Sequence, residues 1–524
     1  MVRWLSGVVV IGLAVGGLLT LLAHVTGPRP WAARPTRRPP LDSISSTVAD
    51  SAVLFARVDA YVVREMHDIR APGGALVIVS RDRIVHARGF GAAAPDGRPV
   101  TRSTPFILGS LSKSFTALAV MQLVESGQID LDAPVQRYLP TFRVRDRRAS
   151  AAITVRHLLN HTSGIPTPAG MLLVAASAAA TRAEQMRLLQ GVRLANDPGR
   201  AFEYSNANYW LLGLIVESIS DEPYDAYVRR HIFDPLDMHD SFTSEDDARA
   251  HGLAQGYRVW FGFPRAETLP YYSRELSVGY LISSPDDMGK YLLAHLNGGR
   301  GPRSRIISDG GLATLHAAPT GGSYAMGWLV DSVASAQILW HTGAVANYHS
   351  DMLIAPKPNF GVAIFANVNN FLLERQFSET IKGVGALLLG YDPPPPAALR
   401  YRETYWIITL AAALWIVWRL YQVATIRRWI GRRDLARSGI TFAWRPDILA
   451  VLVDPGVSVG LVFGLPRLVG APLSTLRWFV PDLTDWLLVN MALSLVLAAS
   501  RLVLAQRPNT AKDLASEQGL ANHR

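Results

Sequence analysis

The sequence predicts an α+β fold followed by transmembrane helices, and two patterns predict it. Between residues 41 and 392, β-strand patterns occur near both ends while helical patterns fill the middle. This order is typical of one antiparallel sheet assembled from the two ends of a domain, with a helical insertion between them. After residue 401 the chain is strongly apolar over three stretches, each close to the roughly 20 residues that a helix needs to cross a bilayer.

The predicted strands are short apolar or alternating runs bounded by turn residues. They span 74–82, 83–91, 324–331, 338–344, 350–356 and 361–368. A helix is predicted before the first strand, from Ser46 to Arg70, and a last helix ends near Leu389. Helical periodicity dominates from Phe115 to about Leu293, so we expect the insertion to be mainly helical.

Apolar and arginine-rich segments predict how the chain meets a membrane. The C-terminal apolar stretches are Tyr405–Val423, Ile448–Leu465 and Trp486–Leu504. The loop between the first two carries six arginines with only one acidic residue, Asp434, among them, so the positive-inside rule places it in the cytoplasm and everything before it outside. Arginines that follow the N-terminal apolar run oppose this orientation, a conflict that cleavage of a signal peptide would remove. We therefore expect a protein of the bacterial inner (plasma) membrane whose main domain is periplasmic or extracellular.

These patterns predict six regions along the chain. They are a signal peptide or signal anchor over 1–27, a Pro/Arg-rich spacer over 28–40, one large domain over 41–392, a linker over 393–400, three transmembrane helices within 401–508 and a cytoplasmic tail over 509–524.

The composition excludes several classes of protein. The chain has no cysteine, which excludes a disulfide scaffold, a thiol nucleophile and cysteine-ligated metals. His157 and His161 have helical spacing, but no third ligand lies nearby and there is no H-E-x-x-H, so no metal or cofactor is expected. The net charge of +10 comes from arginine-rich segments that flank the apolar stretches, which favours the lipid bilayer as a partner over nucleic acid.

The segment from Phe106 to Lys113 opens a largely apolar helix and contains the pattern Ser110-Leu111-Ser112-Lys113. Positions i and i+3 share a helix face, so Ser110 and Lys113 can meet, and a helix N-terminus is electropositive. Arginine would not give up its proton, whereas lysine can, and lysine is rare in this chain. The pair is therefore a candidate nucleophile with its own proton acceptor, although this short pattern alone also arises by chance.

Two further motifs support this interpretation. Tyr204 to Asn206 lies just before a helix, and His341 to Gly343 lies on a late strand. With Ser110 and Lys113, they resemble the motifs of the serine β-lactamase and penicillin-binding protein family, in a class C-like branch that includes esterases, D-amino-acid peptidases and carboxypeptidases. Supporting similarities are 157–166, 235–238 and 283–292. The resemblance covers nearly all of 41–392, and it implies a β-lactamase/transpeptidase-like sheet with an all-helical subdomain.

The resemblance also implies a mechanism. Ser110 would attack a carbonyl and form an acyl-enzyme that water hydrolyses, while Lys113 and the phenol of Tyr204 exchange the proton. A phenol with pKa ~10 becomes a useful base only if a cation such as Lys113 stabilises its phenolate. The backbone amides of Ser110 and Ala344 would form the oxyanion hole. The substrate-binding residues would be Asn206, His341, Thr342 and Gly343.

His341 departs from the β-lactamases of this branch, which carry a lysine there that binds the substrate carboxylate. A histidine with pKa ~6.5 is mostly neutral near pH 7. Recognition of β-lactams and of free C-terminal carboxylates is therefore expected to be weakened, and the histidine is similar to that of the peptidase and esterase members.

The domain order narrows the expected function. An exported catalytic domain followed by three membrane helices is similar to the prodrug-activating peptidases of natural-product pathways, as in colibactin maturation, which remove an N-acyl-D-asparagine leader. We therefore expect a membrane-anchored peptidase acting on N-acyl or D-amino-acid-type amides or on related peptide-like substrates. An esterase, a D-Ala-D-Ala carboxypeptidase or a β-lactamase stays open within the family. The alternative from another class is an acylation-dependent membrane sensor, which the short cytoplasmic segments disfavour.

Overall fold

The computed structural model describes residues 34–35, 48–176, 180–394, 400–424, 446–469 and 471–506. The predicted signal segment 1–27, the spacer 28–40 apart from Arg34 and Pro35, and the tail 509–524 lie outside these residues.

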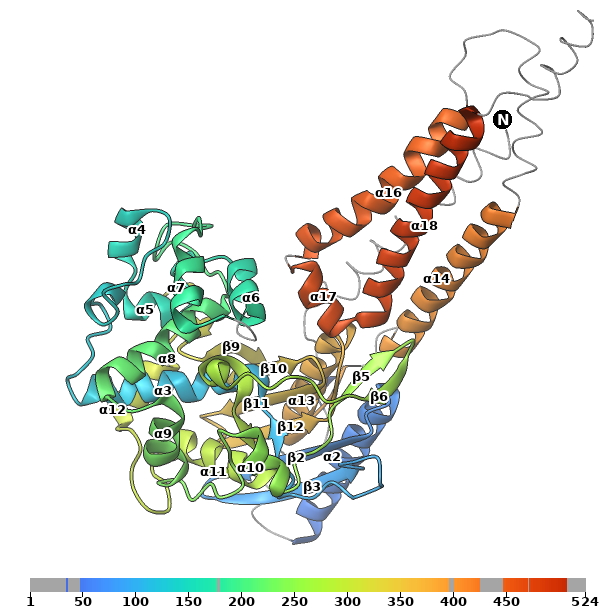
Figure 1. Cartoon of the computed structure of the whole chain (residues 1–524). Helices are drawn as coiled ribbons and strands as arrows, with labels where there is room; N and C mark the ends of the chain where they lie inside the picture. Colours follow the sequence, from blue (N-terminus) through green and yellow to red (C-terminus); the bar gives the residue numbers. More distant parts are fainter. Residues whose placement is uncertain are drawn as a thin grey trace, which may run out of the picture. The chain divides into compact units, whose positions relative to one another are not determined.

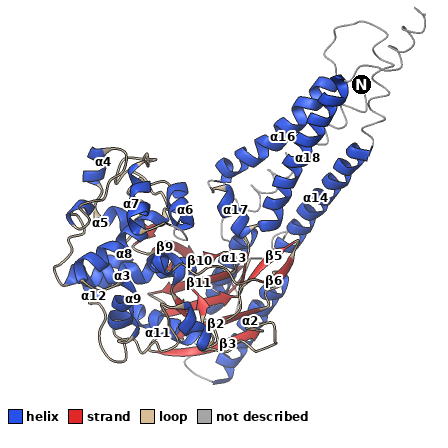
Figure 2. Cartoon of the chain, in the orientation of Figure 1, coloured by secondary structure: helices blue, strands red, loops and turns tan. Residues whose placement is uncertain are grey.

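A seven-stranded sheet forms the centre of the larger part of the structure (Figure 1; strands are red in Figure 2). Its strand order is β3-β2-β12-β11-β10-β9-β8, and every neighbouring pair is antiparallel. The strands are β2 (Gly73–Ser80), β3 (Arg83–Gly91), β8 (Tyr324–Ala325), β9 (Trp328–Val333), β10 (Ala336–Val345), β11 (Tyr348–Ala355) and β12 (Phe360–Ala366). Since β2 pairs with β12, the prediction of one antiparallel sheet built from both ends of the domain is confirmed.

Helices cover both faces of this sheet, so its central strands are buried throughout. Every residue of β2, β11 and β12 is buried. On one face α2 (Val48–Asp68) and α13 (Glu374–Leu388) pack together, with α13 against β11 and β12. On the other face α11 (Pro285–Leu296) packs against β2 and β12. The predicted first and last helices are therefore present, and each differs from its prediction by only one or two residues.

The insertion between β3 and β8 is mainly helical, as predicted. Its central helix α3 (Ser112–Glu125) is buried on nearly all sides and packs against α8 (Asn206–Ser220). Figure 1 shows helices α4 to α8 gathered beside the sheet. The remaining helices are α4 (Arg147–Ala152), α5 (Val155–Leu159), α6 (Thr167–Ala176), α7 (Arg182–Gln190), α9 (Tyr224–Val228), α10 (Glu245–Ala250) and α12 (Asp309–His316). The remaining short strands form three small sheets. In these, β4 (Phe106–Ile107) pairs with β7 (Ile282–Ser283), and β5 (Tyr257–Trp260) lies between β13 (Val368–Asn369) and β6 (Phe263–Ala266). The third sheet pairs β1 (Arg34–Pro35) with β14 (Tyr391–Asp392).

The C-terminal part contains α14 (Tyr401–Ala424), α16 (Pro446–Val469), α17 (Leu473–Phe479) and α18 (Pro481–Gln506). Of these, α14 and α18 are long and apolar enough to cross a membrane. The third predicted span passes the same test only when residues 455–468 are taken together with α17, across a bend of 83°. Two prolines, Pro455 and Pro466, lie inside α16 and remove backbone hydrogen-bond donors there.

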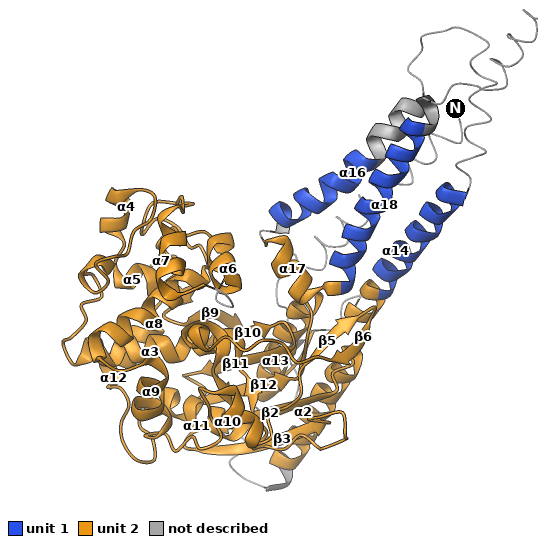
Figure 3. Cartoon of the chain, in the orientation of Figure 1, with its two compact units in different colours: residues 1–22, 406–469, 482–524 blue, residues 23–405, 470–481 orange. Residues whose placement is uncertain are grey.

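The chain divides into two compact units (Figure 3). The larger unit includes residues 470–481, so α17 belongs with the sheet and its helices. The smaller unit contains most of α14, α16 and α18. Its helices share a buried polar cluster, in which Arg419 donates to Asn490 at 3.0 Å and Ser458 lies 3.0 Å from Ser494. Ser458 therefore takes part in helix packing, a role that small polar residues often have in membrane helices.

Candidate active site

The loop after β4 places Ser110 against the edge of β10. Gly109 has a φ of +55°, and a Cβ at this position would lie 2.4 Å from the backbone nitrogen of Ala344. This left-handed conformation favours glycine, and only glycine allows the close approach. Ser110 follows in a 3₁₀ turn (Gly109–Leu111) that leads directly into α3. Ser110 thus lies two residues before α3, in the turn that approaches Ala344, the predicted oxyanion-hole residue.

Lys113 and Tyr204 converge on the same oxygen of Ser110. Lys113 Nζ lies 2.9 Å from Ser110 Oγ, and the Tyr204 hydroxyl lies 3.0 Å from it. The lysine side chain is fully buried, and its Nζ also donates to the carbonyl of Val278 at 2.8 Å. Val278 belongs to a π-helical turn (Leu276–Tyr280), a rare conformation that often occurs at functional sites. Three segments far apart in the sequence therefore fix the lysine and the serine.

Burial sets the protonation states of these groups. It lowers the pKa of Lys113 to about 7, an effect that the nearby Glu275 carboxyl opposes. Burial also raises the pKa of Tyr204 above its usual value, and the hydrogen bond with Ser110 lowers it. Near neutral pH, Lys113 is therefore available as an uncharged amine and Tyr204 keeps its proton. This differs from the expectation that a charged lysine stabilises a tyrosine phenolate, because the sequence carries no measure of burial.

His161 holds the segment that carries Tyr204. Its Nδ1 accepts a hydrogen bond from the backbone N–H of Ser205 at 3.1 Å and lies 2.9 Å from the side-chain nitrogen of Asn208. Its ring lies 4.3 Å from that of Tyr204. From the sequence, His161 was considered only as a possible metal ligand. The signal in the sequence that could have indicated this role of His161 is its place in the family-like segment 157–166.

The predicted substrate-binding residues lie around Ser110. Asn206 begins α8, and its side-chain oxygen is buried with no hydrogen-bond partner among the described residues. Strand β9 pairs only with residues 336–340 of β10, which leaves one edge of 341–345 free beside Gly109. A Cβ at Gly343 would lie 2.1 Å from a backbone oxygen, so the strand needs glycine to approach this closely.

His341 lies deeper than the sequence indicated. It is only 2% exposed, its Nε2 lies 3.0 Å from the Tyr324 hydroxyl, and its Nδ1 lies 2.7 Å from the carbonyl of Thr342. Burial, with the nearby Lys113, lowers the pKa of His341 to about 3. The ring is therefore uncharged at any ordinary pH. Tyr324 was not singled out from the sequence, because nothing local distinguishes it from other core tyrosines.

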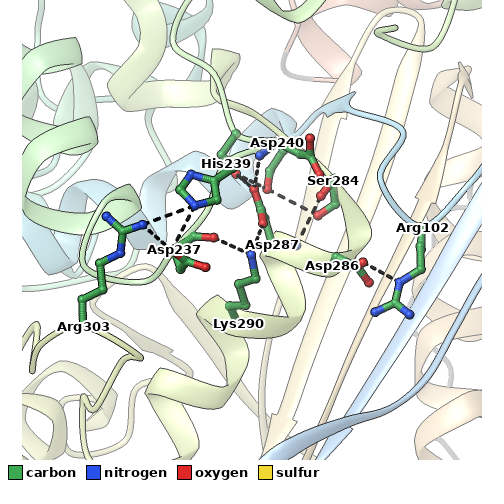
Figure 4. Close-up of polar contacts among 11 residues, drawn as sticks. Arg102, Asp237, His239, Asp240, Ser284, Asp286, Asp287, Lys290 and Arg303 are labelled. Carbon is green, nitrogen blue, oxygen red and sulfur yellow. Dashed lines mark hydrogen bonds and ion pairs between the residues drawn. The ribbon is translucent and has the colours of Figure 1, made fainter. Parts of the chain in front are cut away.

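Two of the family-like segments meet away from Ser110. The buried carboxylate of Asp287 accepts hydrogen bonds from the backbone of Asp240 at 2.7 Å and from Lys290 at 2.9 Å (Figure 4). These contacts connect α11 to the segment that follows 235–238 and are structural. In the described part of the chain, no group of three or more His, Asp or Glu side chains could hold a metal ion.

The antiparallel sheet, the helical subdomain and the cluster of Ser110, Lys113 and Tyr204 define the class of the β-lactamase and penicillin-binding-protein-like serine hydrolases. Residues 58–380 match the family model described as Beta-lactamase, which is more than half of the chain. The chain belongs to this family.

Known relatives support this assignment. Protein flp from Staphylococcus aureus (strain MW2) is 26% identical over 320 residues, which are 60% of this chain and 63% of that protein. Esterase EstB from Burkholderia gladioli is 35% identical over 217 residues, 38% of this chain and 54% of the esterase. The structure of the octameric penicillin-binding protein homologue from Pyrococcus abyssi matches with a TM-score of 0.59 at 28% identity, covering 67% of this chain and 80% of that one. The chain thus spans less than two thirds of the length of these two curated relatives.

Proposed function

We propose that this chain is a membrane-anchored, extracytoplasmic serine hydrolase that acts through an acyl-enzyme. Its preferred substrates would be N-acyl or D-amino-acid-type amides, which makes it a peptidase. The observation that carries the proposal is the convergence of Lys113 Nζ and the Tyr204 hydroxyl on Ser110 Oγ, at 2.9 Å and 3.0 Å.

The geometry supports a specific division of labour. The uncharged amine of Lys113 takes the proton from Ser110 Oγ as this oxygen attacks the substrate carbonyl. The backbone N–H groups of Ser110 and Ala344 stabilise the negative charge that develops on the carbonyl oxygen. Tyr204 gives its proton to the leaving amine, and the proton held by Lys113 restores the tyrosine. Water then attacks the ester with Lys113 again as the base, and Ser110 regains its proton when the acid leaves.

Two features of the cleft support an uncharged amide as substrate. Neutral His341 offers no fixed charge for a carboxylate, and the unpartnered oxygen of Asn206 can accept an N–H of the substrate. Because the relative EstB is named an esterase, an esterase is the second candidate. The ratio of kcat/KM between an amide and the ester of the same acyl group distinguishes the two.

The orientation in the membrane has support from the larger unit. Arg258 donates to the carbonyls of Arg477 and Trp478 in α17, at 3.3 Å and 3.2 Å. These contacts support placing α17 on the same side of the membrane as the catalytic domain, with the arginine-rich loop between α14 and α16 on the other side, in the cytoplasm.

The proposal is tested by labelling the full chain with a fluorophosphonate probe, which reacts with activated serines. Ser110→Ala should abolish both the label and substrate turnover, whereas Ser126→Ala, at the exposed end of the same helix, should change neither. A label retained on the Ser110→Ala variant would place the nucleophile elsewhere. An acyl-enzyme that forms on Ser110 but is never hydrolysed would instead support the sensor alternative.

A further inference from the structure

A buried histidine and aspartate lie on β11, the strand beside β10. In the β10–β11 pair, Thr342 lies opposite Asp351 and Ala344 lies opposite His349. Residues directly opposite in an antiparallel pair point to the same face, as do residues two apart on one strand. Thr342, His349 and Asp351 therefore share one face of the sheet. It is the face that α13 covers, because the ring of Phe377 stacks on His349.

The three side chains are in contact through one nitrogen. His349 Nε2 lies 3.3 Å from Thr342 Oγ1 and 3.2 Å from Asp351 Oδ2. The side chains of His349 and Asp351 have no solvent exposure, and the Phe377 ring lies 3.8 Å from the histidine ring at an angle of 8°. His349 Nδ1 and Asp351 Oδ1 have no hydrogen-bond partner in the part of the chain that the structure describes. The positions of the His349 and Asp351 side chains are thus set by packing and by the contacts of His349 Nε2.

This arrangement determines which way the Thr342 hydroxyl donates. An ionised carboxylate only accepts hydrogen bonds, so its contact with Nε2 places the histidine proton on that nitrogen. The same N–H faces Thr342 Oγ1, which therefore accepts on this side. The hydroxyl proton of Thr342 is then left to be donated elsewhere, and Thr342 is partly exposed on the segment of β10 that β9 leaves unpaired.

We propose that His349 and Asp351 are positioning residues, which make the Thr342 hydroxyl a hydrogen-bond donor to an uncharged carbonyl oxygen in the acyl part of the substrate and select against a carboxylate there. This inference rests on the proposed hydrolase function and adds a substrate class to it: acyl groups that carry a second, neutral carbonyl.

The charges around Thr342 agree with this selection. The carboxylate of Asp351 is connected to the threonine through two hydrogen bonds of His349 Nε2, and it repels a second anion. Glu374, at the start of α13, adds another acidic group; burial raises its pKa and the neighbouring His349 lowers it. Neither His341, which is neutral, nor Lys113, whose pKa is about 7, supplies a permanent positive charge that would offset them.

Three p-nitrophenyl esters of nearly equal acyl shape test the proposal on the full chain. N-acetylglycine carries the neutral carbonyl, 4-methylpentanoate replaces it with a hydrocarbon, and succinate replaces it with a carboxylate. The measured quantities are the ratios of kcat/KM between these esters, because a variant that is merely less stable lowers all three rates together.

Thr342→Val should lower the N-acetylglycyl to 4-methylpentanoyl ratio about three- to tenfold, the range for one neutral hydrogen bond, and mainly through KM. Thr342→Ser keeps the hydroxyl and should restore the ratio. His349→Gln should lower the ratio as Thr342→Val does, and the double variant should lower it no further. Asp351→Asn should raise the relative rate of the succinyl ester about tenfold.

The matched control is Asp59→Asn. Asp59 is also a buried carboxylate bonded to a histidine, at 2.8 Å from His86 Nε2, but it lies at the opposite edge of the sheet beside β3. Its removal should leave both ratios unchanged.

An unchanged ratio in Thr342→Val would overturn the proposal, since the hydroxyl would then not meet the substrate. A lowered ratio in Thr342→Val with unchanged ratios in His349→Gln and Asp351→Asn would also overturn it, because the pair would be structural only. If a buried variant fails to fold, the valine and serine variants at Thr342 still decide whether the hydroxyl donates. Loss of turnover on all three esters by the unaltered chain would refute the hydrolase function itself rather than this inference.

Discussion

Ser110 depends for its proposed reactivity on a lysine that the fold keeps out of water. A lysine in solution is almost fully protonated at neutral pH and is a poor proton acceptor. Burial beside Val278 and Tyr204 lowers the pKa of Lys113 to about 7, so a substantial fraction of the amine is free. Burial thus disfavours the charged form of the side chain that the chemistry needs uncharged.

Lys113→Arg should lower kcat/KM by about 10² or more, because a guanidinium keeps the charge but cannot accept the proton. For the unaltered chain, kcat/KM should rise with pH through about 7 as the lysine loses its proton. Steady-state rates between pH 5 and 9 measure both effects. Lys290→Arg, the same exchange at a partly exposed lysine of α11, should retain activity. Near-normal turnover by Lys113→Arg would mean that the lysine acts only as a cation.

His341→Lys should favour substrates that carry a carboxylate. The unaltered ring is neutral because burial lowers its pKa to about 3, so acidification within the ordinary range does not supply the charge. A partly desolvated lysine–carboxylate contact is worth ~1.5 to 3 kcal/mol, and each 1.4 kcal/mol changes the affinity about tenfold. The ratio of carboxylate to neutral substrate rates, measured at fixed pH, should therefore rise by tenfold or more.

The control for that exchange is His239→Lys, which adds the same charge at an exposed histidine. If the ratio of carboxylate to neutral substrate rates were the same in the unaltered chain, in His341→Lys and in His239→Lys, position 341 would not face the substrate carboxylate. The neutral histidine would then no longer disfavour a β-lactamase.

At the scale of elements, α17 belongs to the larger unit although its sequence neighbours α16 and α18 belong mainly to the smaller one. It lies between α16 and α18 in the sequence, yet it packs with the larger unit through Arg258 and through the Tyr272–Trp478 ring contact. Hydropathy alone shows only a gap between two apolar stretches at this point. The contacts of α17 show that this gap packs with the catalytic domain.

The cysteine-free sequence allows a direct test of this topology. Ser474→Cys, on the exposed side of α17, should react with a membrane-impermeant maleimide added to spheroplasts. Ser438→Cys, in the arginine-rich loop, should react only after the membrane is permeabilised. The unaltered chain should not be labelled at all. Labelling of Ser438→Cys in intact spheroplasts with protection of Ser474→Cys would invert the proposed orientation.

At the scale of the whole molecule, the fold keeps several histidines buried and uncharged. His295 of α11 and His316 of α12 share a hydrogen bond of 2.9 Å beside Trp328. Burial lowers the pKa of both, and that of His316 to about 4. An unfolded histidine titrates near ~6.5, so between pH 6.5 and 4 the unfolded chain binds more protons than the folded one. Stability must therefore fall as the pH falls through this range.

His316→Gln should make this acid sensitivity weaker. Each buried neutral histidine contributes up to about 1.4 kcal/mol of lost stability per pH unit below ~6.5. Melting temperatures of the catalytic unit at pH 7.5 and pH 5 should therefore differ less in this variant than in the unaltered chain. His67→Gln, at an exposed histidine, should leave the difference unchanged. A pH dependence that is identical in His316→Gln would show that this site already binds a proton in the folded protein.

The sequence by itself determined the elements and the candidate chemistry of this protein. Alternating and apolar runs identified the strands of the sheet, because burial on a pleated sheet imposes a local period. The spacing of Ser110 and Lys113 predicted their contact, because i and i+3 are neighbours on any helix. Only the tertiary structure decided the protonation states and the partners: the pKa of Lys113 near 7, the Tyr324 contact of His341 and the His349–Asp351 pair. These features depend on desolvation and on contacts between separate segments, and neither leaves a periodic pattern in the chain.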